Sequence, residues 1–253
     1  MNGYKSRSLK SKWVKTKWLI QDSRLQKYVP ETSLYSKNAL QRMVSRYPMI
    51  YFKPTGGTGG RHIAKIVRLK PNRFRIQKDN ASVTAASVDA LHRELTQFAG
   101  SKSYLIQQGI YLKDTGKRPF DVRVMVQKRN NGAWTPSAIF TKIGKPHKVA
   151  TNYHAGGQLG YLEETLRGAG YSKRQIKAAR SLLETMGRHA GACFDCHGKG
   201  FRELGLDVAM DRCGRYWILE VNTRPQFYPL KHMKDKALYQ RIIRLAKEYG
   251  RTS

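Results

Sequence analysis

Acidic residues are scarce in this chain, which carries 17 Asp and Glu against 48 Lys and Arg, a formal net charge of +31 at pH 7. A chain with so few acids repels itself unless an anionic neighbour screens its charge. We therefore expect a nucleic acid, another anionic polymer or a headgroup-rich surface as a partner. Cysteine is scarce too. Three cysteines, an odd number, provide no disulfide framework and fit a reducing compartment.

Long hydrophobic runs are also missing. No segment approaches the ~20 consecutive apolar residues of a membrane-spanning helix, and the N-terminus lacks the apolar core of a signal peptide. We therefore expect a cytoplasmic protein without a transmembrane segment. The 253 residues, 40% of them hydrophobic, suffice for one compact domain with a core, or for one domain with a small additional lobe.

The N-terminal segment is rich in Lys and Arg and contains no acid before Asp22. Residues 1–20 predict a basic arm that is only partly ordered, and its expected anchors are Trp13, Trp18, Leu19 and Ile20. The arm is either a solubilising surface or a specific polyanion site. No zinc finger, aromatic RNA-binding signature or heptad repeat decides between the two.

Two β-rich runs near the C-terminus flank a polar turn, which indicates a hairpin. Alternation along a strand places Glu220 and Asn222 on one face, and a pairing of Met210 with Arg215 places Asp207 beside them. Carboxylate and amide oxygens are the ligands that Mg²⁺ prefers, and nucleotide phosphates complete its shell. A solvated hairpin face is the alternative, but such a cluster in an acid-poor chain favours the metal.

A glycine-rich loop follows the strand predicted over 47–54 and precedes another predicted over 61–69. Closely spaced glycines let backbone N–H groups approach an anion, and Lys53 just before the loop can contact phosphates. A Walker A loop is excluded because the Gly-Lys-Ser/Thr ending and the following helix are missing. The loop is therefore a phosphate-covering flap or an ordinary flexible turn. Its glycines are Gly56, Gly57, Gly59 and Gly60.

Helical periodicity and capping residues predict four helices. The first spans 32–44 with Ser33 or Ser36 as its cap, and the second begins at its N-cap Ser87 and reaches residue 98. The third and longest begins at a capping box of Ser172 and Gln175 and ends at Gly191. A basic amphipathic helix closes the chain over 229–250.

Further strands are predicted over 74–77, which returns from a hairpin turn at Asn72, and over 104–108, 118–127 and 133–143. In the strand 118–127, Asp121 and Arg123 share the face opposite the apolar one. They form either an ordinary ion pair or a site at which the arginine contacts a transferring phosphoryl group.

The segment Cys193–His197 matches the haem c attachment pattern. We disfavour haem attachment because it accompanies export, for which this chain has no signal. A zinc site that adds Cys213 is also disfavoured, because no second closely spaced ligand pair is present.

Taken in order, these segments resemble the ATP-grasp superfamily and, within it, the YheC/YheD-type endospore coat-associated proteins. The resemblance covers roughly residues 28–228. It is carried by 51–60, 106–109, 118–123, 151–157 with its Thr-Asn and Gly-Gly pairs, and 204–222 with its Asp and Glu-Val-Asn.

The resemblance implies an α+β, ATP-grasp fold in which two lobes with antiparallel sheets and flanking helices hold ATP between them. It implies a basic N-terminal arm over 1–22 and an ATP-grasp domain over 23–253. Within that domain, residues from about 50 to 108 would form the nucleotide-flap lobe and residues from about 109 to 253 the metal-binding lobe.

The resemblance also implies roles for the site residues. The ATP-binding set comprises Lys53 for the phosphates, Gly56, Gly57, Gly59 and Gly60 as the flap, and Gln107 and Gln108 at the adenine hinge. Two Mg²⁺ ions would be bound by Asp207, Glu220 and Asn222. The catalytic set comprises Arg123, Asn152 and Lys142, although Lys142 stands where related proteins often have arginine.

The implied chemistry is transfer of the ATP γ-phosphoryl group to a carboxylate, giving an acyl phosphate that an amine displaces. Related enzymes use a separate N-terminal domain for the acceptor. Little chain precedes Lys53, so we expect the basic surface or a partner to bind an anionic peptide or a cell-envelope or spore component. Two alternatives remain open: a non-catalytic, ATP-binding spore-coat protein, and a nucleic-acid binder that relies on charge.

Overall fold

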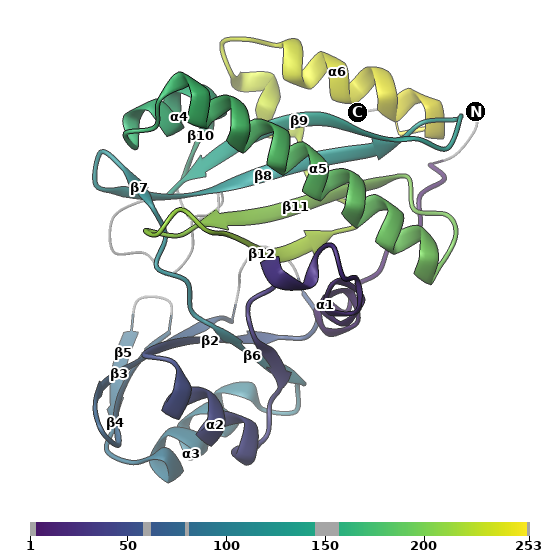
Figure 1. Cartoon of the computed structure of the whole chain (residues 1–253). Helices are drawn as coiled ribbons and strands as arrows, with labels where there is room; N and C mark the ends of the chain where they lie inside the picture. The colour runs from purple at the N-terminus through teal and green to yellow at the C-terminus, as the bar shows by residue number, and fades with distance from the viewer. Residues whose placement is uncertain (1–3, 58–61, 79–80, 145–156, 252–253) are drawn as a thin grey trace.

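The protein folds into two lobes, each built on a mainly antiparallel β-sheet (Figure 1). The computed structural model describes residues 4–57, 62–78, 81–144 and 157–251. The arrangement is α+β, as the resemblance implied. None of the helices in these ranges has the length and apolar character needed to cross a membrane.

The lower lobe contains a six-stranded sheet in the order β1-β6-β2-β3-β4-β5. Helices α2 (Lys37–Arg46) and α3 (Val88–Ala99) pack on it through a core that includes Leu40, Phe52 and Leu91. The strands are β1 (Thr32–Leu34), β2 (Met49–Pro54), β3 (Ala64–Lys70), β4 (Arg73–Lys78), β5 (Ala81–Ala85) and β6 (Tyr104–Gln108).

The start of α2 differs from the prediction. Residues 32–34 form strand β1, which pairs with β6, and the helix begins only after Ser36, whose side chain accepts a hydrogen bond from the Ala39 N–H at 3.1 Å. For α3 the prediction is confirmed, since Ser87 caps it by accepting from the Ala90 N–H at 3.0 Å. The cap of each helix therefore decides where it begins.

The upper lobe contains a second sheet in the order β10-β9-β8-β11-β12, and β7 pairs with β8. Helices α4 (Leu162–Gly168), α5 (Lys173–His197) and α6 (Ala237–Ala246) surround it, with the short 3₁₀ helices η1 (Gln26–Tyr28), η3 (Tyr228–His232) and η4 (Lys247–Tyr249). The strands are β7 (Asp114–Thr115), β8 (Arg118–Lys128), β9 (Trp134–Ile143), β10 (Gln158–Tyr161), β11 (Glu203–Met210) and β12 (Tyr216–Asn222).

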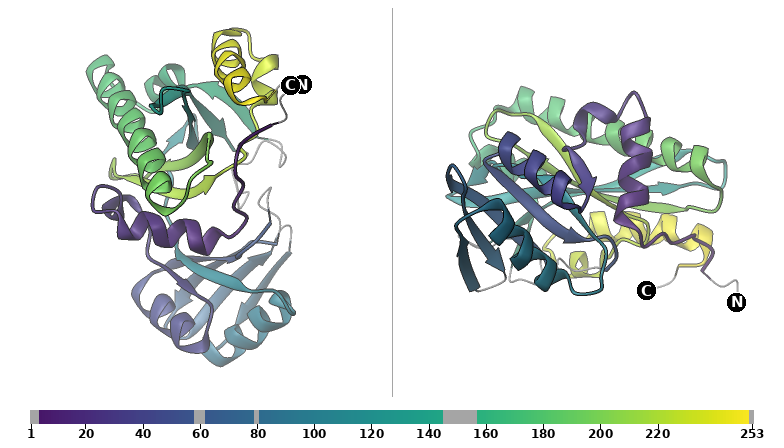
Figure 2. Two further views of the ribbon diagram at one scale, coloured as in Figure 1. Left: turned by 90° about the vertical axis from the view of Figure 1, so that its right-hand side faces the viewer. Right: turned by 90° about the horizontal axis from the view of Figure 1, so that it is seen from below.

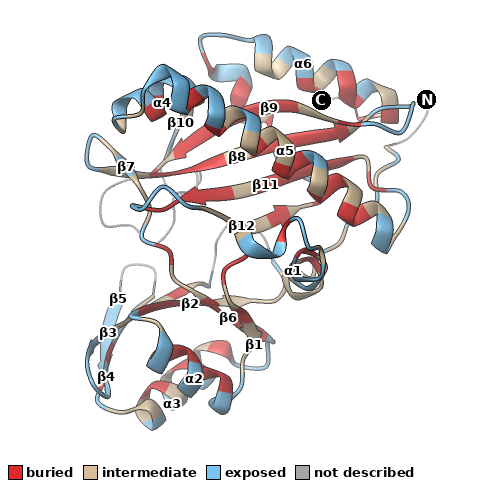
Figure 3. Cartoon of the chain, viewed as in Figure 1, coloured by how far each residue is buried: buried red, intermediate tan, exposed pale blue. Residues whose placement is uncertain are grey.

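The two faces of the upper sheet bury different side chains. Residues such as Val122 and Val124 of β8 pack against α5, whereas Met125 packs on the other face with residues near and in α6. Figure 3 shows the central strands as largely buried. Because side chains alternate along a strand, Asp121 and Arg123 lie on the face of Met125, beyond the cluster that packs with α6. Charged side chains of β8 therefore gather on this face, where they form ion pairs.

Helix α5 begins with the predicted capping box of Ser172 and Gln175 but continues past the predicted end at Gly191. A Cβ at Gly191 would lie 2.3 Å from the ring of Trp134, so this glycine permits close packing of α5 on β9. The helix ends at His197, before Gly198.

The N-terminal segment is tied to the upper lobe instead of forming a loose arm. Helix α1 (Lys12–Gln21) packs along β12 and α5 and lies between the lobes (Figure 2). Of the expected anchors, Leu19 is buried and Trp18 stacks on His197 with ring centroids 4.8 Å apart. Ile20 is 38% exposed, so its prediction as an anchor is wrong.

Both ends of the described chain meet at Glu203, a fully buried residue at the start of β11. Its carboxylate accepts hydrogen bonds from the hydroxyls of Tyr4 at 2.5 Å and Tyr249 at 2.9 Å, and it pairs with Arg251. Four polar groups from distant parts of the sequence thus satisfy one another inside the upper lobe.

Candidate functional site

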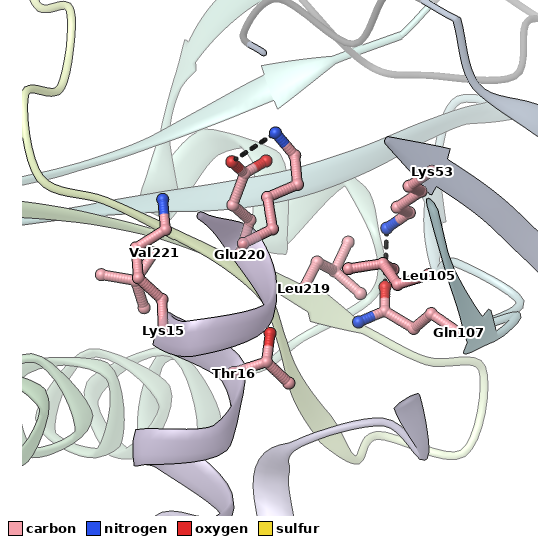
Figure 4. Close-up of a pocket in the computed structure, with 9 residues that line it drawn as sticks. Lys15, Thr16, Lys53, Leu105, Gln107, Leu219, Glu220 and Val221 are labelled. Carbon is pink, nitrogen blue, oxygen red and sulfur yellow. Dashed lines mark hydrogen bonds and ion pairs between the residues drawn. The ribbon is translucent and has the colours of Figure 1, made fainter. Parts of the chain in front are cut away.

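A cavity lies between the lobes, and three parts of the chain line it (Figure 4). The lower lobe provides Lys53 from β2 and Gln107 from β6, strand β12 provides Glu220, and helix α1 provides Lys12 and Lys15. The predicted phosphate-contacting lysine and one predicted metal ligand therefore line the same space from opposite lobes.

Asp207 is the centre of an ion cluster on the upper sheet. Its carboxylate accepts two hydrogen bonds from Arg123, at 2.7 and 3.1 Å, and one from the Lys142 ammonium at 2.9 Å. Lys142 also pairs with Asp121 at 2.9 Å. An ion pair of Arg123 with Asp121 was the simple interpretation of their spacing; instead Arg123 bonds to the neighbouring strand β11, and Lys142 bridges the two acids.

Burial and ion pairing act in opposite directions on this cluster. Burial alone would raise the pKa of Asp207, but the charges of Arg123 and Lys142 hold that pKa well below its usual range. Burial alone would lower the pKa of Lys142, and the carboxylates of Asp121 and Asp207 raise it above its usual value. Asp207 and Lys142 are therefore both ionised at neutral pH.

The structure brings the predicted metal ligands together. Asp207 lies directly opposite Glu220 in the β11–β12 ladder, next to a β-bulge, and the Asn222 amide lies 3.4 Å from the Asp207 carboxylate. The predicted pairing of Met210 with Arg215 is wrong, because Met210 pairs with Tyr216. The three side chains still meet because the bulge shifts the ladder between Asp207 and Val208.

The chemistry of this donor set fits magnesium. Two carboxylates and an amide supply oxygen atoms, which Mg²⁺ complements with phosphate and water oxygens. Within the described ranges no three His, Cys, Asp or Glu side chains gather as a metal site would require, so the set depends on Asn222. Arg123 and Lys142 already bond Asp207, which leaves Glu220, 28% exposed and 3.3 Å from Lys12, as the more accessible carboxylate.

Lys53 is held in place by Gln107. The Lys53 ammonium donates a hydrogen bond to the Gln107 Oε1 at 2.6 Å, and the Gln107 amide nitrogen donates to the Thr32 hydroxyl at 3.1 Å. Burial lowers the pKa of Lys53 to about 8. The Gln108 side chain accepts from the Glu31 N–H at 3.3 Å. Both glutamines therefore hold the sheet and its lysine in position, and their role at an adenine hinge stays a prediction.

The flap is described only in part. Gly57 has φ +92°, a conformation that favours glycine, and its carbonyl accepts a hydrogen bond from Lys12 at 2.6 Å. Gly56 has no atom within 4 Å of an added Cβ. Gly59, Gly60 and Asn152 lie outside the described residues.

Sequence reasoning missed the contribution of helix α1. Lys12 and Lys15 are three residues apart, so a helix places them on one face. This spacing is informative only if the segment is helical, and its basic composition predicted a partly ordered arm instead of a helix. The cysteines take no part in this site: Cys193 is buried in α5, and Cys196 and Cys213 are exposed.

Comparison with known proteins extends the resemblance over nearly the whole chain. A family model described as "YheC/D like ATP-grasp" matches residues 4–252. The endospore coat-associated protein YheD of Bacillus subtilis (strain 168) is 28% identical over 222 residues, which are 85% of this chain and 48% of YheD. YheC of the same organism is 25% identical over 87% of this chain and 61% of YheC. The chain thus spans about half the length of the curated relatives it matches.

Solved structures share the fold at low sequence identity. An ADP complex of N5-carboxyaminoimidazole ribonucleotide synthetase, purK, has a TM-score of 0.55 at 12% identity, covering 95% of this chain and 52% of that one. The D-cycloserine synthetase DcsG has a TM-score of 0.54 at 13% identity, covering 92% and 70%. The ATP-grasp ligase PsnB has a TM-score of 0.52 at 13% identity, covering 94% and 60%. With the family match over residues 4–252, the chain is a member of the YheC/D-like ATP-grasp family.

Proposed function

We propose that this protein is an ATP- and Mg²⁺-dependent ligase that joins a carboxylate to an amine through an acyl phosphate. The observation that carries the proposal is the cavity of Figure 4, which Lys53 of one lobe and Glu220 of the other both line, with Asp207 opposite Glu220 in the sheet. ATP-grasp proteins are typically ATP-dependent ligases, and three ligases or synthetases share this fold.

The ion cluster around Asp207 contains groups that can bring an acceptor carboxylate close to the triphosphate of ATP. A carboxylate and a triphosphate repel each other, so their approach requires fixed positive charge. Arg123 supplies such a charge, and its two hydrogen bonds to Asp207 fix the plane of its guanidinium group. Asp207, Glu220 and Asn222 would hold magnesium, which when bound neutralises phosphate charge.

The acceptor is proposed to be anionic, a peptide or a cell-envelope or spore component that presents a carboxylate. The net charge of +31 favours such a molecule, because electrostatic attraction raises the rate at which it meets the protein. The two curated relatives are named endospore coat-associated proteins, which makes the spore coat a reasonable source of acceptors.

The test measures ADP and phosphate release with Mg²⁺ across a library of carboxylate acceptors and amines. We expect one pair to stimulate release and Glu220→Gln to lower it by about 100-fold or more, the usual cost of losing a group that stabilises the transition state. Glu184→Gln is the matched control, because Glu184 lies on α5 beside Arg188, away from the cavity.

Two results would favour the other functions. ATP binding without turnover for any acceptor, and a Glu220→Gln strain without a phenotype, would identify a non-catalytic coat protein. Salt-sensitive binding to DNA or RNA that ATP does not affect, in a protein that fails to bind ATP, would identify a nucleic-acid binder.

A further inference from the structure

Helix α1 forms a wall of the cavity opposite the lower lobe. Lys12 and Lys15 are three residues apart and so lie on the same face of the helix, and both line the space that Lys53 lines from β2. Figure 4 shows Lys15 and Lys53 at this space. The helix is held there by its packing on β12 and α5, by the buried Leu19, and by a hydrogen bond from the Lys12 N–H to the Thr55 carbonyl at 2.7 Å.

Lys15 is buried without an anionic partner. Its exposed fraction is 5%, and no described residue accepts a hydrogen bond from its ammonium or pairs with it within 4.0 Å. Burial lowers its pKa, and the charges of Glu220 and Asp207 act in the opposite direction from beyond ion-pair distance. The ammonium itself is not fully buried. An ammonium without an ion pair at the wall of a cavity is suited to bind an anion.

The charges that line the cavity are unbalanced. Among its lining residues, three ammonium groups, those of Lys12, Lys15 and Lys53, face one carboxylate, that of Glu220. Lys12 pairs with Glu220 at 3.3 Å, and Lys53 bonds to the neutral Gln107. Two positive charges are therefore left, on Lys15 and Lys53, and they belong to opposite walls. An anion with several oxygens, such as a nucleotide triphosphate, would contact both.

We propose that Lys15 is a phosphate-binding residue that the N-terminal helix supplies to the nucleotide site. The proposal rests on the proposed function only in taking this cavity to be the place where ATP binds. Lys12 has a supporting role, because its ammonium donates to the Gly57 carbonyl and pairs with Glu220, so that it joins the glycine loop to strand β12. The basic N-terminal segment is then part of the binding site.

The experiment titrates the full chain with a non-hydrolysable ATP analogue and Mg²⁺ by calorimetry, and with adenosine as a probe that has no phosphate. We expect Lys15→Met to weaken binding of the analogue by about tenfold or more, the usual worth of a hydrogen bond to a charged group. Adenosine binding is expected to stay the same. Lys15→Arg keeps the charge and is expected to restore most of the affinity.

Lys17→Met is the matched control, because Lys17 is exposed on the same helix and does not line the cavity. Thermal melting confirms that each variant is folded. Unchanged affinity of Lys15→Met for the analogue would overturn the inference. Tighter binding would overturn it too, since α1 would then be a plug that competes with the nucleotide. If the analogue binding depends on Lys15 but no acceptor supports ADP release, the proposed ligase function fails while this inference stands.

Discussion

Removing the charge of Asp207 tests whether the ion cluster stabilises the fold. In Asp207→Asn, Arg123 and Lys142 lose their shared carboxylate, and their side chains are only 12% and 7% exposed. Removing one partner of a buried ion pair typically costs 3–5 kcal/mol. The slight exposure of the pair places our expectation at the lower end, about 3 kcal/mol, since solvent screens part of the interaction. For a chain of this size that is a fall in Tm of roughly 6–12 °C.

The assay is urea unfolding followed by tryptophan fluorescence, without nucleotide or metal. Asp114→Asn serves as the control, because Asp114 is exposed on β7. In a double-mutant cycle with Lys142→Met, the two effects are expected not to add, because the residues share one interaction. A variant that is as stable as the parent, or more stable, would refute the reasoning. Unchanged or raised stability would be expected instead if Asp207 lay mainly among other negative charges that a metal ion neutralises.

Two further predictions concern single residues. Because Lys53 must be protonated to attract phosphate and burial lowers its pKa to about 8, affinity for the ATP analogue is expected to be constant below pH 8 and to fall above it. Lys53→Arg, titrated by calorimetry across the same range, is expected to reduce the fall without removing it, because the pKa of Lys15 is also lowered by burial. A fall of unchanged size would contradict the assignment. Gly205→Ala would place a Cβ 2.6 Å from Pro225 and 3.3 Å from Arg123, so we expect destabilisation by about 1–3 kcal/mol in urea. Gly56→Ala, with no atom within 4 Å of the added Cβ, is the control. Equal stability of the two variants would contradict the expectation and would mean that Pro225 moves to relieve the close contact.

Local signals predicted the elements whose boundaries local chemistry decides. The strand predicted over 118–127 is β8 because its alternation requires one buried face, and α3 begins after Ser87 because a hydroxyl there satisfies a free N–H. The glycine at 191 was misleading for a physical reason. A glycine that ends a helix and a glycine that lets a helix approach a tryptophan look alike in sequence, and only the position of Trp134 distinguishes them.

Only the part of the site that lies on a single hairpin, β11 and β12, could be predicted from the sequence. Asp207, Glu220 and Asn222 lie on neighbouring strands of a hairpin, where alternation places Glu220 and Asn222 on one face and a β-bulge brings Asp207 opposite Glu220. The partners of Asp207 come from β8 and β9, and the pairing of those strands with β11 depends on the whole upper sheet. Lys15 was missed because a helix in a basic segment is stabilised by distant apolar partners, as Leu19 is in the upper core.

The meeting of Tyr4 and Arg251 at Glu203 has a consequence for the order in which the lobes form during synthesis. Every strand of the lower sheet lies between residues 32 and 108, so that sheet can assemble while the rest of the chain is still being translated. The carboxylate of Glu203 gains its arginine only after residue 251 has been translated. This ion pair of β11 therefore forms later than the lower sheet can, and the upper lobe is the later of the two to mature.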